Sequence, residues 1–150
     1  MRRALLLAAA LLVAGSPAAA QSRDRLLRTA IHRLAREQNG SVFGPWAYAQ
    51  GDLDGDGVRD RLALFTIEGM GGGNNYSFYL AVQLSTSRWR PITEGIGGKL
   101  NRSPQSVRVQ GRTIVVPMRE WTDTDGGCCP TREAVARFRL SGGRIVEVDR

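Results

Sequence analysis

Hydrophobic side chains recur at helical spacing along residues 22–39. They fall at intervals of three and four and form a single stripe: Leu26, Leu27, Ala30, Ile31, Leu34 and Ala35. Ser22 or Asp24 can cap the start of a helix here, and Asn39-Gly40 is a typical stop. The pattern therefore predicts one amphipathic helix over residues 22–39.

After Gly40 the pattern changes to short apolar runs separated by turn residues, which is typical of β-strands. Gln110-Gly111 and Ser141-Gly142-Gly143 indicate hairpin turns. Pro117 lies inside one run and predicts an edge or a bulge there. The candidate strands are Trp46–Gln50, Arg61–Ile67, Tyr76–Ser85, Trp89–Thr93, Ser106–Gln110, Arg112–Arg119, Ala134–Leu140 and Arg144–Val148.

The order of these elements predicts the fold class. No helix-length periodic segment separates consecutive strands, so parallel crossovers are not expected. We therefore expect an α+β fold, in which an N-terminal amphipathic helix is followed by an antiparallel, meander-like β-sheet. Closure of this sheet into a barrel and its division into a sandwich are both left open.

Residues 1–20 have the three parts of a secretory signal peptide. Two arginines at the start precede an apolar core of about twelve residues, which is too short to span a bilayer. Ala18-Ala19-Ala20 supplies the small residues that a signal peptidase needs. We expect cleavage before Gln21, a single domain over residues 21–150, and a periplasmic or secreted protein.

Charge and hydropathy narrow the choice of partner. The formal net charge of +7 includes the two arginines of the signal, so the mature chain carries about +5. A basic balance permits polyanionic partners, but the arginines are scattered along the chain. We therefore expect no nucleic acid as partner. After the signal no stretch approaches the roughly 18 apolar residues of a membrane span, so no transmembrane segment is expected in the mature chain.

Four aspartates crowd one short stretch between two predicted strands: Asp52, Asp54, Asp56 and Asp60. Two carboxylates about 5 Å apart repel by about 3 kcal/mol at an effective dielectric constant near 20, so such a run favours a bound cation. Calcium takes about six to eight oxygen ligands in flexible geometry. We expect these four carboxylates and the backbone carbonyl of Val58 to bind one Ca²⁺ ion.

The details of this loop distinguish it from an EF-hand. Gly57 falls where such loops turn sharply, but Ala63 stands where an EF-hand has its bidentate glutamate. The stretch Asp52–Asp60, followed by Leu62-Ala63-Leu64-Phe65, resembles the loops of FG-GAP and VCBS-type repeats in integrin-like and bacterial surface proteins. This resemblance implies an ion site and no propeller. The alternative is an acidic surface turn without an ion.

A second resemblance covers most of the mature chain. It comprises the aspartate loop, then Gly71-Gly72-Gly73 before Tyr79-Leu80-Ala81-Val82, then Cys128-Cys129-Pro130-Thr131. This order is similar to a family of small, uncharacterised exported bacterial proteins. The resemblance implies no particular activity.

Cys128 and Cys129 are adjacent, and an exported chain meets an oxidising compartment. Neighbouring Cα atoms lie about 3.8 Å apart, below the usual range for a disulfide. A vicinal disulfide would therefore be a strained ring that suits a redox or switch role. The alternatives are two buried thiols and a bridge to another chain.

No motif in the chain amounts to an active site. His32 is the only histidine, which removes most familiar acid–base arrangements. We expect a calcium-binding structural or interaction module of the cell envelope, non-enzymatic, with an unknown envelope protein or glycan as partner. The alternative is a small thiol/disulfide redox protein that acts through Cys128 and Cys129.

Overall fold

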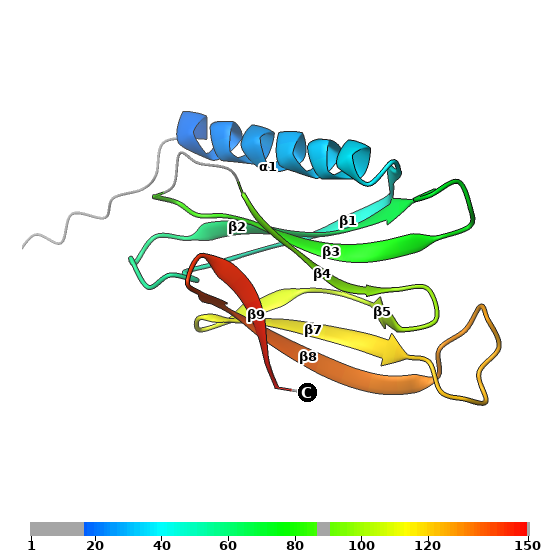
Figure 1. The fold of residues 1–150 in the computed structure, drawn as a ribbon. Coiled ribbons are helices and arrows are strands. Elements are labelled where there is room, and N and C mark those ends of the chain that lie inside the picture. Colours follow the sequence, from blue (N-terminus) through cyan, green and yellow to red (C-terminus); the bar gives the residue numbers. More distant parts are fainter. Residues whose placement is uncertain (1–16, 87–90, 150) are drawn as a thin grey trace, which may run out of the picture.

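The computed structural model describes residues 17–86 and 91–149, which form one helix and one nine-stranded sheet (Figure 1). The helix, α1, spans Pro17–Glu37. The strands are β1 (Ser41–Gly51), β2 (Asp60–Glu68), β3 (Tyr76–Gln83), β4 (Ile92–Gly98), β5 (Arg102–Pro104), β6 (Arg108–Gln110), β7 (Thr113–Glu120), β8 (Arg132–Ser141) and β9 (Arg144–Asp149).

The sheet is an antiparallel meander, which confirms the predicted α+β fold class. Its strand order is β1-β2-β3-β4-β5-β7-β8-β9, and β6 pairs with β7 beside this path. Each pairing in the sheet is antiparallel. Among the described strands, β1 and β9 stand at the two ends of this order and do not pair with each other. The sheet therefore stays open and does not close into a barrel.

The sheet folds over on itself and encloses the larger core. In Figure 1 α1 lies above β1–β4, and the later strands form a further layer below them. Side chains from the facing halves meet between these two layers. Those of the buried centre are Leu53, Leu62, Leu64, Leu80, Val82, Ile96, Ile114, Val116, Met118, Ala136, Phe138 and Ile145.

The helix covers the opposite face of β2 and β3. Leu27 and Ile31 of α1 are buried against Ala63 and Phe65 of β2. Because successive side chains of a strand point to opposite faces, β2 serves both cores and reads as a nearly continuous apolar run. This arrangement uses the predicted apolar stripe of the helix.

Two backbone hydrogen bonds after the last turn explain where α1 stops. Asn39 adopts a left-handed conformation with φ of 51°, and its N–H donates to the carbonyl of Arg36. The N–H of Gly40 donates to the carbonyl of Ala35, which completes a Schellman cap.

At its N-terminal end α1 includes the expected cleavage point before Gln21, and most of the predicted signal lies outside the described residues.

Three strands differ from the sequence prediction by more than two residues: β1 begins at Ser41 instead of Trp46, β4 extends beyond Thr93, and β5 has no counterpart in the prediction. β4 continues through Gly95, Gly97 and Gly98, residues with low strand propensity, whereas Trp89 of the predicted strand lies outside the described residues. A Cβ atom on Gly97 would stand 2.5 Å from the carbonyl oxygen of Arg102, so close contact with β5 favours glycine there. Both β5 and this part of β4 depend on tertiary contact.

Pro117 lies in β7, which is an interior strand. Its residue pair on one side is Val135 of β8. On the other side the neighbouring pairing is interrupted between β5 and β6, and only the N–H of Gln105 donates to the Pro117 carbonyl. Proline has no N–H to donate, and at this position the gap between β5 and β6 requires none. Pro117 is therefore tolerated in an interior strand for the same reason as at the predicted edge or bulge.

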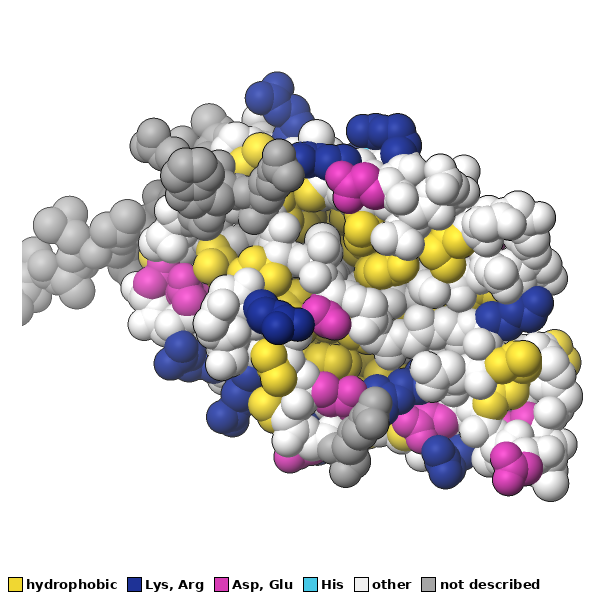
Figure 2. Space-filling model, in the orientation of Figure 1, with side chains coloured by type: hydrophobic (Ala, Val, Ile, Leu, Met, Phe, Trp, Pro, Cys, Tyr) yellow, Lys and Arg dark blue, Asp and Glu magenta, His cyan; other side chains and the backbone are white. Residues whose placement is uncertain are grey.

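Charged side chains of both signs are interspersed over the face shown in Figure 2. This distribution agrees with the scattered arginines of the sequence and gives no single basic face in that view. None of the described helices combines the length and the hydropathy needed to cross a membrane.

Candidate metal centre

The aspartate run forms the loop between β1 and β2. Gly51 at the end of β1 pairs with Asp60 at the start of β2, so the intervening residues close into a hairpin loop. Gly55 and Gly57 have φ values of 87° and 83°, a region that glycine enters without steric cost. Gly57 thus makes the sharp turn that its position in the loop predicts.

Three of the carboxylates converge. Oxygen atoms of Asp52, Asp54 and Asp60 all lie within 4.8 Å of one another. Two oxygens that bind one calcium ion at about 2.4 Å can be at most about 4.8 Å apart, so this spacing fits a shared cation. The three side chains can therefore hold a metal ion.

Backbone amides hold the carboxylates in this arrangement. The carboxylate of Asp52 accepts hydrogen bonds from the N–H of Gly55 (2.6 Å) and of Gly57 (3.0 Å), one on each oxygen. Asp54 accepts from the N–H of Asp56 at 3.2 Å. An ionised carboxylate has about four lone-pair sites, so these bonds leave room for a cation.

Asp60 is the buried member of the group, with 0% of its surface exposed. Its two oxygens accept from the N–H of Leu53 and of Ser85, each at 2.8 Å. Burial raises the pKa of this carboxyl, although the two hydrogen bonds oppose the shift, and the neighbouring carboxylates of Asp54 and Asp56 add to it. A cation between the carboxylates would favour the ionised form.

Asp56, the fourth expected carboxylate, is not a member of this converging group. The carboxylate of Asp56 accepts from the N–H of Val58 (2.7 Å) and from the hydroxyl of Ser85 (2.8 Å). These bonds, the backbone bond first, lower the pKa of Asp56. The Val58 side chain is exposed. The structure thus brings together three of the four expected carboxylates.

Sequence reasoning missed two residues that hold the loop. Ser85, just after β3, contacts both Asp56 and Asp60. Arg112, in the β6–β7 turn, donates to the backbone carbonyls of Leu53 (3.4 Å) and Asp54 (2.6 Å). Both are remote from the loop in sequence, and no local motif marks them.

Cys128 and Cys129 form a vicinal disulfide, with Cα atoms 3.8 Å apart. Both residues are exposed in the loop between β7 and β8. This connectivity is compatible with a structural ring and with a redox ring, so it does not choose between the two functional hypotheses.

Asp125 organises the same loop. Its carboxylate accepts from the hydroxyl (2.7 Å) and the N–H (3.1 Å) of Thr131 and from the N–H of Thr122 (2.8 Å). These bonds, led by that of the Thr131 hydroxyl, lower the pKa of Asp125. The indole N–H of Trp121 donates to the Gly126 carbonyl at 3.1 Å and fixes the ring at the loop base.

Comparison of the chain with protein-family models, curated proteins and solved structures returned no match.

Proposed function

We propose that this protein is an exported, calcium-binding module of the cell envelope with a structural or interaction role and no enzymatic activity. The observation that carries the proposal is the convergence of Asp52, Asp54 and Asp60 in one glycine-containing loop. Their resemblance to FG-GAP and VCBS-type loops and the predicted signal peptide point in the same direction.

Calcium is the proposed ion because the donors are hard oxygen atoms on a hairpin loop, and calcium accepts a flexible coordination geometry. The two further ligands are Asp56, after its carboxylate turns from Ser85, and the carbonyl of Val58. Magnesium demands a tighter octahedral geometry at about 2.1 Å and gives up its water reluctantly, so it should bind this loop more weakly.

The role of the ion is to stabilise the fold. A cation that binds the folded chain alone adds RT ln(1 + [L]/Kd), about 2.7 kcal/mol at a hundredfold excess over Kd. The loop joins β1 to β2 and contacts Ser85 and the β6–β7 turn, so the ion would connect segments of both sheet layers. The proposed partner is an envelope protein or a glycan, and the proposed location is the periplasm or the cell exterior.

Calorimetric titration of the chelator-treated mature protein tests the proposal. We expect one calcium ion per chain and a rise in melting temperature at millimolar calcium. Asp54→Ala should weaken binding because it removes a ligand and a charge, whereas Asp123→Ala, in the other exposed loop, should leave binding unchanged. The absence of binding heat and of a calcium-dependent melting shift would falsify the site.

The vicinal disulfide supports one alternative, a thiol/disulfide redox protein. Both sulfur-bearing residues are exposed, so a partner thiol can reach them. In that case the protein should accelerate the reduction of insulin disulfides by dithiothreitol, and Cys128→Ser should abolish the acceleration. A rate equal to that of dithiothreitol alone would exclude this alternative.

A further inference from the structure

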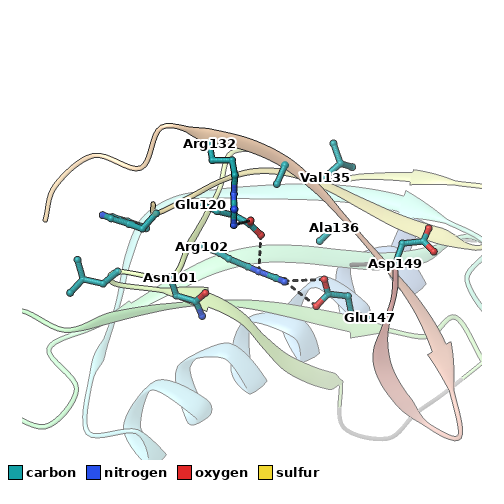
Figure 3. A pocket seen from close by; sticks show the side chains of 11 residues that line it. Asn101, Arg102, Glu120, Arg132, Val135, Ala136, Glu147 and Asp149 are labelled. Carbon is teal, nitrogen blue, oxygen red and sulfur yellow. Dashed lines mark hydrogen bonds and ion pairs between the residues drawn. The ribbon is translucent and has the colours of Figure 1, made fainter. Parts of the chain in front are cut away.

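A groove lies on the inner face of β7 and β8, and no residue of the aspartate loop lines it (Figure 3). Its volume is about 620 Å³, within the range of about 300–1,000 Å³ that is usual for small-ligand sites. The inward-facing residues of these strands are apolar in the core and become charged where β7 ends and β8 begins. Met118 is followed on the same face by Glu120, and Ala134 is preceded by Arg132.

The groove exists because the curled sheet is open here. Ala134 and Ala136 are among its lining residues, and their small side chains leave space that larger residues fill elsewhere in the core. The open end of this sheet is therefore a formed cavity with a polar rim.

Arg102 is the central polar group of the groove. Its side chain is only 13% exposed, and it contacts two carboxylates, Glu120 at 3.1 Å and Glu147 at 3.0 Å. Arg132 contacts the same Glu120 at 2.6 Å. Figure 3 shows Arg102 directed between Glu120 and Glu147. A third carboxylate of the lining, Asp149, lies 4.0 Å from the guanidinium of Arg137. Each carboxylate of the groove is thus matched by an arginine, and the balanced charges select neither an anion nor a cation.

Such a cluster suits a neutral ligand with many hydroxyl groups. Guanidinium groups only donate hydrogen bonds and carboxylates only accept them, whereas a hydroxyl does both. Trp121 lines the same groove, and its indole N–H is already bonded to Gly126, which leaves its ring as an apolar, oriented surface. Asn101 adds an amide that can both donate and accept.

We propose that this groove is a binding site for a neutral oligosaccharide, with Trp121 contacting the apolar face of a sugar ring and Asn101, Arg102 and Glu120 contacting hydroxyls. This inference rests on the proposed interaction role and names the class of its partner. The groove does not share residues with the aspartate loop. Arg112 holds that loop at one end of β7 and Glu120 stands at the other, roughly 25 Å away for a strand of this length.

An NMR titration of the ¹⁵N-labelled mature protein tests the proposal. The probes are cellotetraose, maltotetraose and chitotetraose, each raised to millimolar concentration, first with chelator and then with calcium. We expect at least one probe to shift amides of β5, the end of β7 and the start of β8, together with the Trp121 indole signal. No shift with any of the three, or shifts confined to other regions, overturns the proposal.

Variants of the groove sharpen this test. Trp121→Ala should weaken binding at least about tenfold, the effect of losing about 1.4 kcal/mol, and Asn101→Ala should weaken it less. Glu133→Ala, an exposed change on the opposite face of β8, is the control and should bind normally. Trp121→Phe retains a ring without the bond to Gly126, so it separates stacking from loop anchoring. Unchanged affinity in Trp121→Ala contradicts the assigned role.

Two further probes test the ligand class. A heparin-derived tetrasaccharide represents an anionic ligand and trilysine a cationic one. Groove shifts with either of these, and with no neutral probe, overturn the proposal. The calcium titration is an independent test. If sugar binds but calcium does not, the proposed ion site alone is wrong. If calcium binds but no sugar does, the proposed sugar site alone is wrong.

Discussion

Asp60 and Asp54 belong to one cluster but have different structural roles. Asp60 is buried and accepts the backbone N–H groups of Leu53 and Ser85, which ties the loop to the end of β3. Asp54 accepts one longer hydrogen bond, from the N–H of Asp56. One carboxylate therefore supports the fold without an ion, whereas the other contributes mainly repulsion until a cation is present.

Two alanine substitutions should separate these roles in calcium-free protein. Asp60→Ala leaves two N–H groups without their acceptor and should lower the free energy of unfolding by about 3 kcal/mol, despite the relief of repulsion. Asp54→Ala should change it little or raise it. Urea unfolding in chelator measures both, and an equal loss in the two variants would contradict the distinction.

At the level of elements, β2 connects the two cores because neighbouring residues face opposite layers. Leu64 points into the core between the sheet halves, and Phe65 packs beneath α1 beside Tyr79, with ring centroids 5.6 Å apart. Both side chains are buried. The helix thus depends on one face of a strand whose other face supports the rest of the sheet.

Substitutions at these two neighbours should loosen different parts of the molecule. Leu64→Ala should cost about 2–5 kcal/mol and Phe65→Ala about 3–5 kcal/mol, since each leaves a cavity. Hydrogen exchange in α1 should rise selectively in Phe65→Ala, because its side chain contacts the helix layer. Equal acceleration across α1 and β7–β8 in both variants would argue against two separable cores.

The β7–β8 loop should show a pH dependence set by Asp125. Its hydrogen bonds lower the pKa of Asp125 below the ordinary value of 3.8. Because the folded-state pKa lies below that of the unfolded chain, the ionised carboxylate contributes stability above pH 3.8. This contribution is lost as the pH falls through the lowered pKa.

Asp125→Asn tests this sign. The difference in unfolding free energy between the parent and the variant should be largest well above pH 3.8 and should shrink in more acidic solution. Urea titrations followed by tryptophan fluorescence measure it. Asp123→Asn, in the same loop, is the matched control, and a difference for Asp125→Asn that grows on acidification would refute the assignment.

At the scale of the whole molecule, the described residues separate two regions along β7. The aspartate loop contacts Arg112 before this strand, and the groove begins with Glu120 at its end. Changes at well-separated sites usually add in free energy, so ion binding and groove binding should be measurable independently. The helix that covers the other side begins at Pro17, four residues before the expected cleavage point.

Export should remove residues 1–20, because their basic start, short apolar core and small residues match what a signal peptidase accepts. The intact mass of the exported protein should correspond to a chain that begins at Gln21, allowing for cyclisation of this glutamine. Helix α1 would then begin there and retain Leu27 and Ile31, its buried contacts. A membrane-bound product that still contains Met1 would disprove the cleavage.

The sequence by itself determined features that depend on local spacing. The apolar period of α1, the stop at Asn39-Gly40, the Gly142-Gly143 hairpin and the turn at Gly57 follow from backbone preferences that act over a few residues. The antiparallel meander follows from the lack of crossover segments. The candidate aspartates were visible for the same reason, since their carboxylates are close in the chain.

Only the tertiary structure decided the features that depend on contacts between residues far apart in the sequence. Ser85 and Arg112 reach the loop from other hairpins, and this selects Asp52, Asp54 and Asp60, without Asp56, for the converging group. The glycine-rich end of β4 becomes a strand because β3 and β5 flank it. The groove depends on how far the sheet curls, which is set by packing between distant strands and not by the spacing within any one of them.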